Sequence, residues 1–289
     1  MAFPDDFTWG VAAASYQVDG VASEDGKGES VWDMFSHKPG AVWSGHTGDV
    51  ACDHYHRRPQ DVAMMRDLSV RAYRFSVSWP RVMPDGTGAV NEPGLDFYDR
   101  LVDELLAADI EPYLVLFHWD YPYALFKRGG WLNPRSPQWF ADYARVVVDR
   151  LSDRVSNWFT ILEPACFIGL GHWSGEHAPG LRLGRRQVLQ AGHNALLAHG
   201  RAVQVIRAHA RREPRIGLVP AGNSYTPVTE EPADVVAARE LTFSAREGDL
   251  FYYTWWLDPV YLGRYPEDAL RLYGEDAPDV AQGDMELIN

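Results

Sequence analysis

The sequence predicts an α/β fold in which a parallel sheet is covered by helices. Five short apolar runs alternate with five amphipathic runs along the 289 residues, and repeated strand–helix units of this kind form parallel sheets. Long loops rich in Gly, Pro, Trp and His follow the apolar runs at 16–58, 80–93, 120–135 and 165–185. In a (β/α)8 barrel such loops emerge on one face and build the active site, so we expect this architecture, formed as a single domain over residues 1–289.

Five segments are expected to form strands because each is short, apolar and bounded by polar or turn-forming residues. In chain order they are "FTWGVAAAS" (7–15), "RAYRFSVSW" (71–79), "EPYLVLFHW" (111–119), "NWFTILEP" (157–164) and "RIGLVPA" (215–221). In the second segment Arg74 alternates with Tyr73 and Phe75, so its side chain points away from the apolar side of the strand. Inside a barrel an Arg in this position needs a carboxylate partner.

Helices are expected between and after these strands, at 59–69, 94–109, 136–154, 186–210 and 234–253. In the second of these, apolar residues recur at the spacing of one helix face, namely Leu95, Tyr98, Val102, Leu105 and Leu106. The third begins at "SPQWF", where we expect Ser136 to be the N-cap and Pro137 the first helical residue.

Charge and composition argue against several classes of partner. The net charge is −13 and no segment is rich in Lys and Arg, which argues against binding to nucleic acid or to an anionic membrane. No apolar run approaches the length of a membrane span, and the first residues, "MAFPDDFTWG", do not have the pattern of a signal peptide. Cys52 and Cys166 are too few for a disulfide framework, so we expect a cytoplasmic protein.

Polar and aromatic side chains at the ends of the first and third strands could hold a hydroxylated ring. His118 and Trp119 close the third strand, in "LFHWD", and combine a ring that donates and accepts hydrogen bonds with a flat indole. Gln17, in "SYQVDG", follows the first strand and offers an amide donor and a carbonyl acceptor, which match a vicinal diol. Taken singly, each of these residues is equally typical of an ordinary core or loop position.

Seven motifs make a more specific pattern when they are taken together. They are "FPDDFTWGVAAASYQVDG", "YRFSVSWPRVMPDGTGAVN", "FHWDYPYAL", "GGWLN", "HAPG", "AHGRAV" and "LDPVYLGRYPED". By their order and spacing the whole chain resembles the family 1 glycoside hydrolases, the β-glucosidase family. The resemblance implies a (β/α)8 TIM barrel of the family 1 glycosidase type and retaining hydrolysis of a small β-glucoside or oligosaccharide, without a cofactor.

The resemblance also implies roles for five residues of this chain. Gln17, His118 and Trp119 match the family's sugar-binding positions. Glu163, at the end of the fourth strand, matches its general acid/base. Arg74 matches the barrel Arg that lies beside the catalytic nucleophile.

Glu163 ends the apolar run "WFTILEP", where a carboxylate is costly to bury unless it is paired, hydrogen-bonded or protonated. Cleavage of a glycoside needs a proton delivered to a poor leaving group, so one carboxyl group has to be protonated near neutral pH. The apolar neighbours Phe159, Ile161 and Leu162 favour the protonated form by desolvation. A general acid therefore accounts for a Glu in this setting.

Three features depart from the family's pattern. Leu162 stands where the family has an Asn that hydrogen-bonds the sugar 2-hydroxyl, and Ala221 stands where it usually has a second Asn. In "GDMELIN" the sequence stops where the family's sixth strand would begin, so we expect strands six to eight, and the Glu-Asn-Gly stretch with the nucleophilic Glu, to be absent. We expect an incomplete barrel of about five strand–helix units, with open sheet edges through which the chain self-associates.

Three hypotheses of function stay open. The first is a retaining glycoside hydrolase of the β-glucosidase type, of which this chain is the N-terminal part or a shortened form. The second is a truncated or decayed homologue without catalysis, at most a weak sugar-binding protein. The third is an inverting hydrolase, which needs a second carboxyl group about 6.5–9.5 Å from Glu163; Asp120 is the candidate for it.

One further cluster has the composition of a metal site. "ACDHYHR" brings together Cys52, Asp53, His54 and His56. It lacks a second ligand pair at the spacing of a zinc site, so we expect no metal there.

Overall fold

A five-stranded parallel sheet is the centre of the computed structural model, which describes residues 3–4 and 6–289. Its strands are β1 (Gly10–Ala12), β2 (Ala72–Ser76), β3 (Glu111–Phe117), β4 (Asn157–Leu162) and β5 (Arg215–Val219). Their order across the sheet is their order along the chain, and each strand pairs in parallel with the next. The predicted architecture of an incomplete barrel is confirmed, with five strands in one open sheet whose edges are β1 and β5.

Helices follow the strands in turn. The long ones are α3 (His54–Asp67), α5 (Glu92–Ala107), α7 (Ser136–Leu151), α8 (Arg185–His209) and α9 (Pro232–Phe243). The shorter ones are α1 (Ser15–Val18), α2 (Val31–Ser36), α4 (Trp79–Val82), α6 (Tyr123–Phe126), α10 (Tyr253–Leu262), α11 (Glu267–Tyr273) and α12 (Asp284–Ile288), with 3-10 turns at Trp43–Gly45, Gly130–Leu132 and Gly274–Asp276 and a π-helix at Ala165–Ser174. Within residues 3–4 and 6–289, every helix is too short or too polar to cross a membrane.

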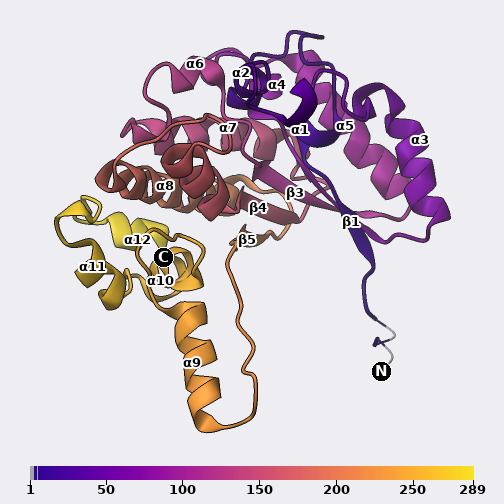
Figure 1. Ribbon diagram of the computed structural model, residues 1–289. Coiled ribbons are helices and arrows are strands. Elements are labelled where there is room, and N and C mark those ends of the chain that lie inside the picture. Colours follow the sequence, from indigo (N-terminus) through magenta and orange to yellow (C-terminus); the bar gives the residue numbers. More distant parts are fainter. Residues whose placement is uncertain (1–2, 5) are drawn as a thin grey trace.

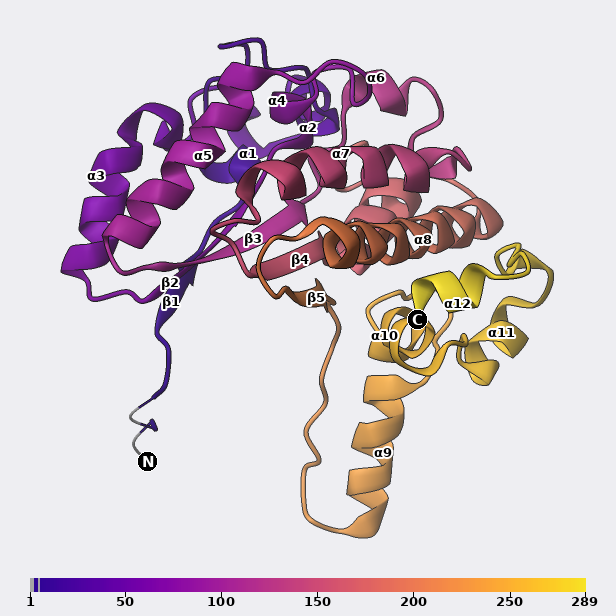
Figure 2. The same cartoon turned by 180° about the vertical axis from the view of Figure 1, so that it is seen from behind.

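The helices occupy three places around the sheet (Figures 1 and 2). Helices α3, α5, α7 and α8 cover its outer side, while α1, α2, α4 and α6 gather beyond the carboxyl ends of the first strands. A long extended segment after β5 leads to α9, which projects away from the sheet (Figure 1). The loops after β1, β2 and β3 therefore form one layer, as the barrel architecture predicts, whereas the segment after β5 runs away from it (Figure 1).

The apolar stripe of α5 shows how the core forms. Leu95, Tyr98, Val102 and Leu105 are at most 3% exposed, as the helical spacing predicts, whereas Leu106 is 37% exposed. The largest fully buried side chains include five of the eleven tryptophans: Trp79, Trp131, Trp158, Trp255 and Trp256. Nearly half of the tryptophans therefore fill the core rather than a ligand site.

Two predicted starts are wrong. The first strand candidate, 7–15, yields only the three residues of β1, because the chain turns at Ala14 into the short helix α1. Ser136 is not the N-cap of α7 but its first residue, since Arg135 occupies the cap position. The Ser136 hydroxyl bonds the Tyr121 hydroxyl at 2.8 Å instead of capping its own helix.

Two predictions near the other ends of elements are also wrong. The helix expected at 234–253 ends at Phe243, where Ser244 turns to an extended conformation and Gly248 takes a φ of +71° that breaks helical winding. The next helix then starts separately at Tyr253. The loop expected after β4, at 165–185, contains the π-helix Ala165–Ser174.

Candidate active site

A cleft of about 430 Å³ lies beyond the carboxyl ends of β1 and β3. Gln17, His118 and Trp119 line it together, as the sequence predicts. Tyr16, Trp32, His46, Thr47 and His177 also line it, from the long loops after β1 and β4. Its volume falls within the range of small-molecule sites, and its walls combine aromatic rings with a few polar groups.

His118 and Trp119 follow directly on the buried strand β3. Burial, together with the positive charge of Arg74, lowers the pKa of His118 to about 4, so its ring is neutral near pH 7. Trp119 has a positive φ of 76°, a conformation that costs energy for a non-glycine residue. Its indole N–H donates to the Leu162 carbonyl at 2.8 Å, which fixes the orientation of the ring.

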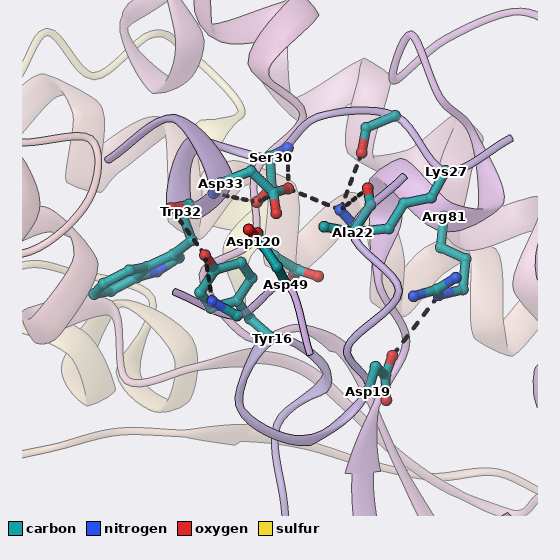
Figure 3. Close-up of polar contacts among 12 residues, drawn as sticks. Tyr16, Asp19, Ala22, Lys27, Ser30, Trp32, Asp33, Asp49, Arg81 and Asp120 are labelled. Carbon is teal, nitrogen blue, oxygen red and sulfur yellow. Dashed lines mark hydrogen bonds and ion pairs between the residues drawn. The ribbon is translucent and has the colours of Figure 1, made fainter. Parts of the chain in front are cut away.

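Gln17 reaches the cleft from α1, a single helical turn. Its side chain is exposed, in contrast to the buried Ser15 two residues earlier. The neighbouring Tyr16 hydroxyl donates to the Trp32 carbonyl at 3.1 Å and accepts from the Gly48 N–H at 3.2 Å (Figure 3). These bonds join α1 to the loop that follows it.

Three aromatic rings form one wall of the cleft. The His177 ring lies 5.6 Å from the Trp32 ring and 5.5 Å from the Trp119 ring, measured between centroids. Burial lowers the pKa of His177, which favours its neutral form. A wall of this kind presents flat apolar surface with polar edges, which suits the faces of a sugar ring.

Glu163 follows β4 immediately and has a positive φ of 53°. Its backbone N–H donates to the Val219 carbonyl at 2.6 Å, and the Cys166 thiol donates to its Oε2 at 3.6 Å. Burial, together with the Glu163 charge, raises the pKa of Cys166 to about 12, so this thiol keeps its proton. Glu163 is partly exposed but does not line the cleft of Gln17, His118 and Trp119.

The register of the sheet nevertheless relates Glu163 to that cleft. Phe117 of β3 pairs with Ile161 of β4, so Trp119 and Glu163 each lie two residues beyond this pair on neighbouring strands. The bond from Trp119 to the Leu162 carbonyl joins the two strand ends. A strained residue therefore lies just beyond the end of each of the neighbouring strands β3 and β4, and such residues are enriched at functional sites.

Arg74 lies in β2, and the expected alternation holds, since Tyr73 and Phe75 are buried while Arg74 is only partly so. Its Nε is buried without a hydrogen-bond partner, and no carboxylate lies within 4 Å of the guanidinium in the part of the chain that the structure describes. The carboxylate partner expected of it is not supplied by these residues. Its charge acts instead on His118.

Asp120 is not placed to serve as the second carboxylate of an inverting hydrolase. It is 1% exposed, it does not line the cleft, and its Oδ2 accepts a bond from the Ser15 hydroxyl at 2.9 Å. A base that activates water has to reach solvent on the open side of the sugar, so the structure argues against this hypothesis.

The residues of "ACDHYHR" have separate partners. His54 bonds Asp61 at 2.6 Å, whereas His56 bonds Asp53 at 2.7 Å on the surface. Cys52 is exposed and unpaired with any other cysteine. No group of three or more potential metal ligands occurs in residues 3–4 and 6–289.

Five of the named cleft residues were missed from the sequence, Tyr16 among them, although one signal was present. His177 belongs to "HAPG", a motif of the resemblance, and Trp32, His46 and Thr47 lie in the long loop after the first strand. Loops at strand ends were expected to hold the site, but nothing in their sequence indicates which side chains fold back over the cleft.

Comparisons with known proteins agree on one family. The model of glycosyl hydrolase family 1 matches residues 1–289. Beta-glucosidase A of Acetivibrio thermocellus is 45% identical over 291 residues, which cover 100% of this chain and 63% of that protein. Beta-glucosidase A of Thermotoga maritima is 45% identical over 286 residues, 99% of this chain and 62% of that protein.

Solved structures give the same result for the fold. The beta-glucosidase from Thermotoga maritima in complex with glucoimidazole superposes with a TM-score of 0.89 at 45% identity, covering 99% of this chain and 63% of that one. The same enzyme in complex with deoxynojirimycin gives a TM-score of 0.90. The chain thus spans about 63% of the length of the relatives it matches.

Proposed function

The chain belongs to glycosyl hydrolase family 1, and from that premise we propose that it forms the sugar-binding and acid/base side of a retaining β-glucosidase-type hydrolase. The observation that carries the proposal is the cleft in which Gln17, His118 and Trp119 meet, beside the strand end that bears Glu163. The named relatives are beta-glucosidases, so a β-glucoside is the proposed substrate.

In this proposal Gln17 and His118 bond the hydroxyl groups of the sugar, and Trp119 packs against its ring. The neutral His118 can donate from one ring nitrogen and accept at the other, which suits a hydroxyl partner better than an imidazolium would. Leu162, where the family has an Asn, cannot bond the 2-hydroxyl, so one contact that strengthens in the transition state is replaced by an apolar one.

Glu163 is the proposed general acid/base. As an acid it protonates the glycosidic oxygen while the bond from C1 to that oxygen breaks and a carboxylate attacks C1. As a base it then takes a proton from water, which attacks C1 while the bond from C1 to the carboxylate breaks, and the sugar is released with its configuration retained. The attacking carboxylate has to lie about 5–5.5 Å from the acid, on the other face of the sugar.

No residue of 1–289 is assigned as this nucleophile. The resemblance places it beside Arg74, whose Nε lacks a partner among the described residues. We therefore propose that residues 1–289 by themselves bind a β-glucoside but do not hydrolyse it at an ordinary enzyme's rate. The competing hypothesis, a homologue without catalysis, also predicts that this chain does not hydrolyse a β-glucoside. The two hypotheses differ only in the turnover that they predict for a longer form of the protein.

Two measurements test the proposal. The first titrates glucoimidazole into the 289-residue chain at pH 7 by calorimetry, and we expect saturable binding that His118→Ala weakens at least tenfold. The second assays this chain with 4-nitrophenyl β-D-glucoside, and we expect negligible turnover. Absence of binding would contradict the sugar site, while ordinary turnover that Glu163→Ala abolishes would place the nucleophile within residues 1–289.

A longer form of the protein that carries a nucleophile tests Glu163 itself. Glu163→Gln should lower turnover of an alkyl β-glucoside by about 10²- to 10⁴-fold, because its leaving group needs a proton. The glycosylation step of the activated nitrophenyl substrate should suffer much less. Glu213→Gln, at an exposed Glu before β5, is the matched control. Equal losses on both substrates would contradict an acid role, and no turnover before any substitution would favour the homologue without catalysis.

A further inference from the structure

Helix α1, which carries Gln17, has little stability of its own. It is one turn of four residues, Ser15–Val18, and its N-cap residue Ala14 has no side chain that can cap it. A single turn fixes several backbone dihedrals for about one hydrogen bond, so it forms only where tertiary contacts hold it. The position of Gln17 in the cleft therefore depends on what anchors α1.

Ser15 supplies that anchor through two buried bonds. Its backbone N–H donates to the Ser76 hydroxyl of β2 at 2.8 Å. Its own hydroxyl donates to Oδ2 of Asp120 at 2.9 Å. Both Ser15 and Asp120 are at most 3% exposed, so water does not replace these bonds. A hydrogen bond to a charged acceptor of this kind is stronger than a neutral one.

Asp120 is covalently joined to the opposite side of the cleft. It directly follows Trp119, whose positive φ and indole bond to the Leu162 carbonyl fix the end of β3. One uninterrupted connection thus runs from Gln17 through Ser15 and Asp120 to Trp119, and on to the residue before Glu163. Figure 3 shows Asp120 together with the charged residues Lys27, Asp33 and Arg81.

We propose that Asp120, as a carboxylate, is a positioning residue that holds α1 against the end of β3, so that Gln17 and Trp119 keep the separation that a bound sugar requires. This inference rests on the proposed sugar-binding role of the cleft. Asp120 touches no substrate in it and acts only through Ser15 and Trp119.

Asp120 changes its protonation state near physiological pH. Burial raises its pKa to about 6, while hydrogen bonds from Ser78 and Ser15 and the charge of Lys27 oppose the shift. Above that pH the carboxylate accepts the Ser15 bond with full charge, and below it the protonated group offers a weaker neutral acceptor. Binding that depends on this bond should therefore weaken as the pH falls through about 6.

Asp19, which caps the C-terminal end of α1, is buried with a raised pKa and is paired with Arg81 at 3.8 Å (Figure 3). The other groups near Asp120 change charge outside this range or belong to other pairs. Burial raises the pKa values of Tyr98 of α5 and Tyr143 of α7 well above 10, so both phenols stay neutral. Lys27 lies 2.7 Å from Asp33 and is paired with it (Figure 3). The cleft residue His177 has a lowered pKa and also titrates in acid, so a variant of Asp120 has to separate the two effects.

The test measures how the dissociation constant of phenyl 1-thio-β-D-glucoside depends on pH. This probe is uncharged and resists hydrolysis, so its own ionisation does not enter. With the 289-residue chain we expect at least a fivefold weakening between pH 7 and pH 5. Asp120→Asn should bind at least fivefold more weakly at pH 7 and should lose most of the pH dependence. Ser15→Ala should do the same, whereas Ser152→Ala, a buried serine at the end of α7, should change neither.

Hydrogen exchange separates this inference from the sugar-binding proposal. Protection of the α1 amides, corrected for intrinsic exchange, should fall at least tenfold in Asp120→Asn and in Ser15→Ala, with or without sugar. If the unsubstituted chain fails to bind the probe but α1 loses protection in these variants, the anchor is supported and the sugar site is contradicted. If the chain binds the probe and Asp120→Asn keeps both its pH dependence and its α1 protection, the positioning role is overturned.

Discussion

The central strands and the edge strands of this sheet are made of similar residues but differ sharply in burial. In β3, Leu114, Val115 and Leu116 are completely buried, whereas Val11 in β1 is 41% exposed and the other two residues of that strand are exposed as well. The other edge strand, β5, buries only Leu218 of its five residues. The comparison teaches that the central strands carry most of the stability, while the edges are held mainly by one neighbour each.

The exposed apolar side chains follow the same division. Phe3, Phe7 and Trp9, which precede β1, pack on one another with ring centroids 4.5–4.8 Å apart, yet each stays at least 43% exposed. On the side of β5, the projecting helix α9 exposes Val235, Val236, Leu241 and Phe243. Both edges therefore present apolar surface that further protein could cover.

The largest expected effect is the loss of folding stability in acid, which arises near the central strand β4. Burial lowers the pKa values of His172 and His199, which flank the central strand β4, to about 4, below about 6.5 in the unfolded chain. Because the unfolded state then binds more protons, stability is complete above pH 6.5 and falls as the pH drops toward 4, by up to about 3 kcal/mol per histidine.

Urea unfolding at pH 7, 5.5 and 4.5 measures this loss. His199→Gln should be less stable than the unsubstituted chain at pH 7 but should lose less between pH 6.5 and 4. His56→Gln, at an exposed histidine whose pKa is raised by its bond to Asp53, is the control and should not show that flattening. A free energy of unfolding that is constant over this range would contradict the prediction.

The same truncation in a central strand and in an edge strand should give different losses. Val115→Ala in β3 removes two fully buried methyl groups and should cost about 2 kcal/mol, from lost transfer energy and the remaining cavity. Val11→Ala in β1 should cost less than about 1 kcal/mol, because this side chain keeps much of its contact with water. Urea midpoints at constant m-value give both numbers, and similar losses would remove the distinction between the two regions.

The edges should also control self-association of the 289-residue chain. Val11→Lys places a charge on the open edge of β1 and should shift the association constant severalfold toward the monomer. Val228→Lys, at a residue that is 92% exposed outside any strand, is the matched control. Sedimentation velocity over a range of concentrations checks this, and a chain that is monomeric before substitution would show that the open edges do not associate.

The smallest effect is expected from the ion pairs outside the core. Arg154, just after α7, pairs with Asp99 and Asp103 of α5 on the outer surface of the helix layer. Arg154→Ala should cost roughly 0.5–1 kcal/mol, and less at high salt, because exposed pairs gain little over their hydrated ions. Arg66→Ala, at an exposed pair with Asp67, should cost less. If Arg154→Ala lowered the free energy of unfolding as much as Val115→Ala does, the surface ion pairs would contribute as much to stability as the central strands.

The accuracy with which the sequence predicts each strand and helix depends on whether that element has a recognisable residue pattern. All five strands could be predicted because a buried parallel strand reads as an apolar run of limited length. The end of α9 at Phe243 could not, since the sequence predicts a helix that runs past Ser244, whose backbone is extended in the structure. The exposure of β1 at the edge could not be predicted either, because β1 is as apolar as the strands that are buried.

The candidate site divides in the same way. Gln17, His118 and Trp119 could be placed together because each follows a strand, and parallel strands end at the same side of a sheet. Trp32 and His177 could not be, since the path of a long loop has no periodicity. The positive φ of Trp119 and Glu163 could not be predicted either, because among residue types glycine is the usual sequence indicator of that conformation.

The agreement between strand order and chain order has a consequence for synthesis on the ribosome. Every strand pairs with the one made just before it, and the starts of successive strands are about 40 to 60 residues apart. At roughly 5–20 residues per second, each new strand emerges several seconds after its partner, which is long compared with helix and hairpin formation. We expect the sheet to grow by one strand at a time at a single edge, so that the edge a chaperone has to protect moves with each new strand while the edge at β1 stays open throughout.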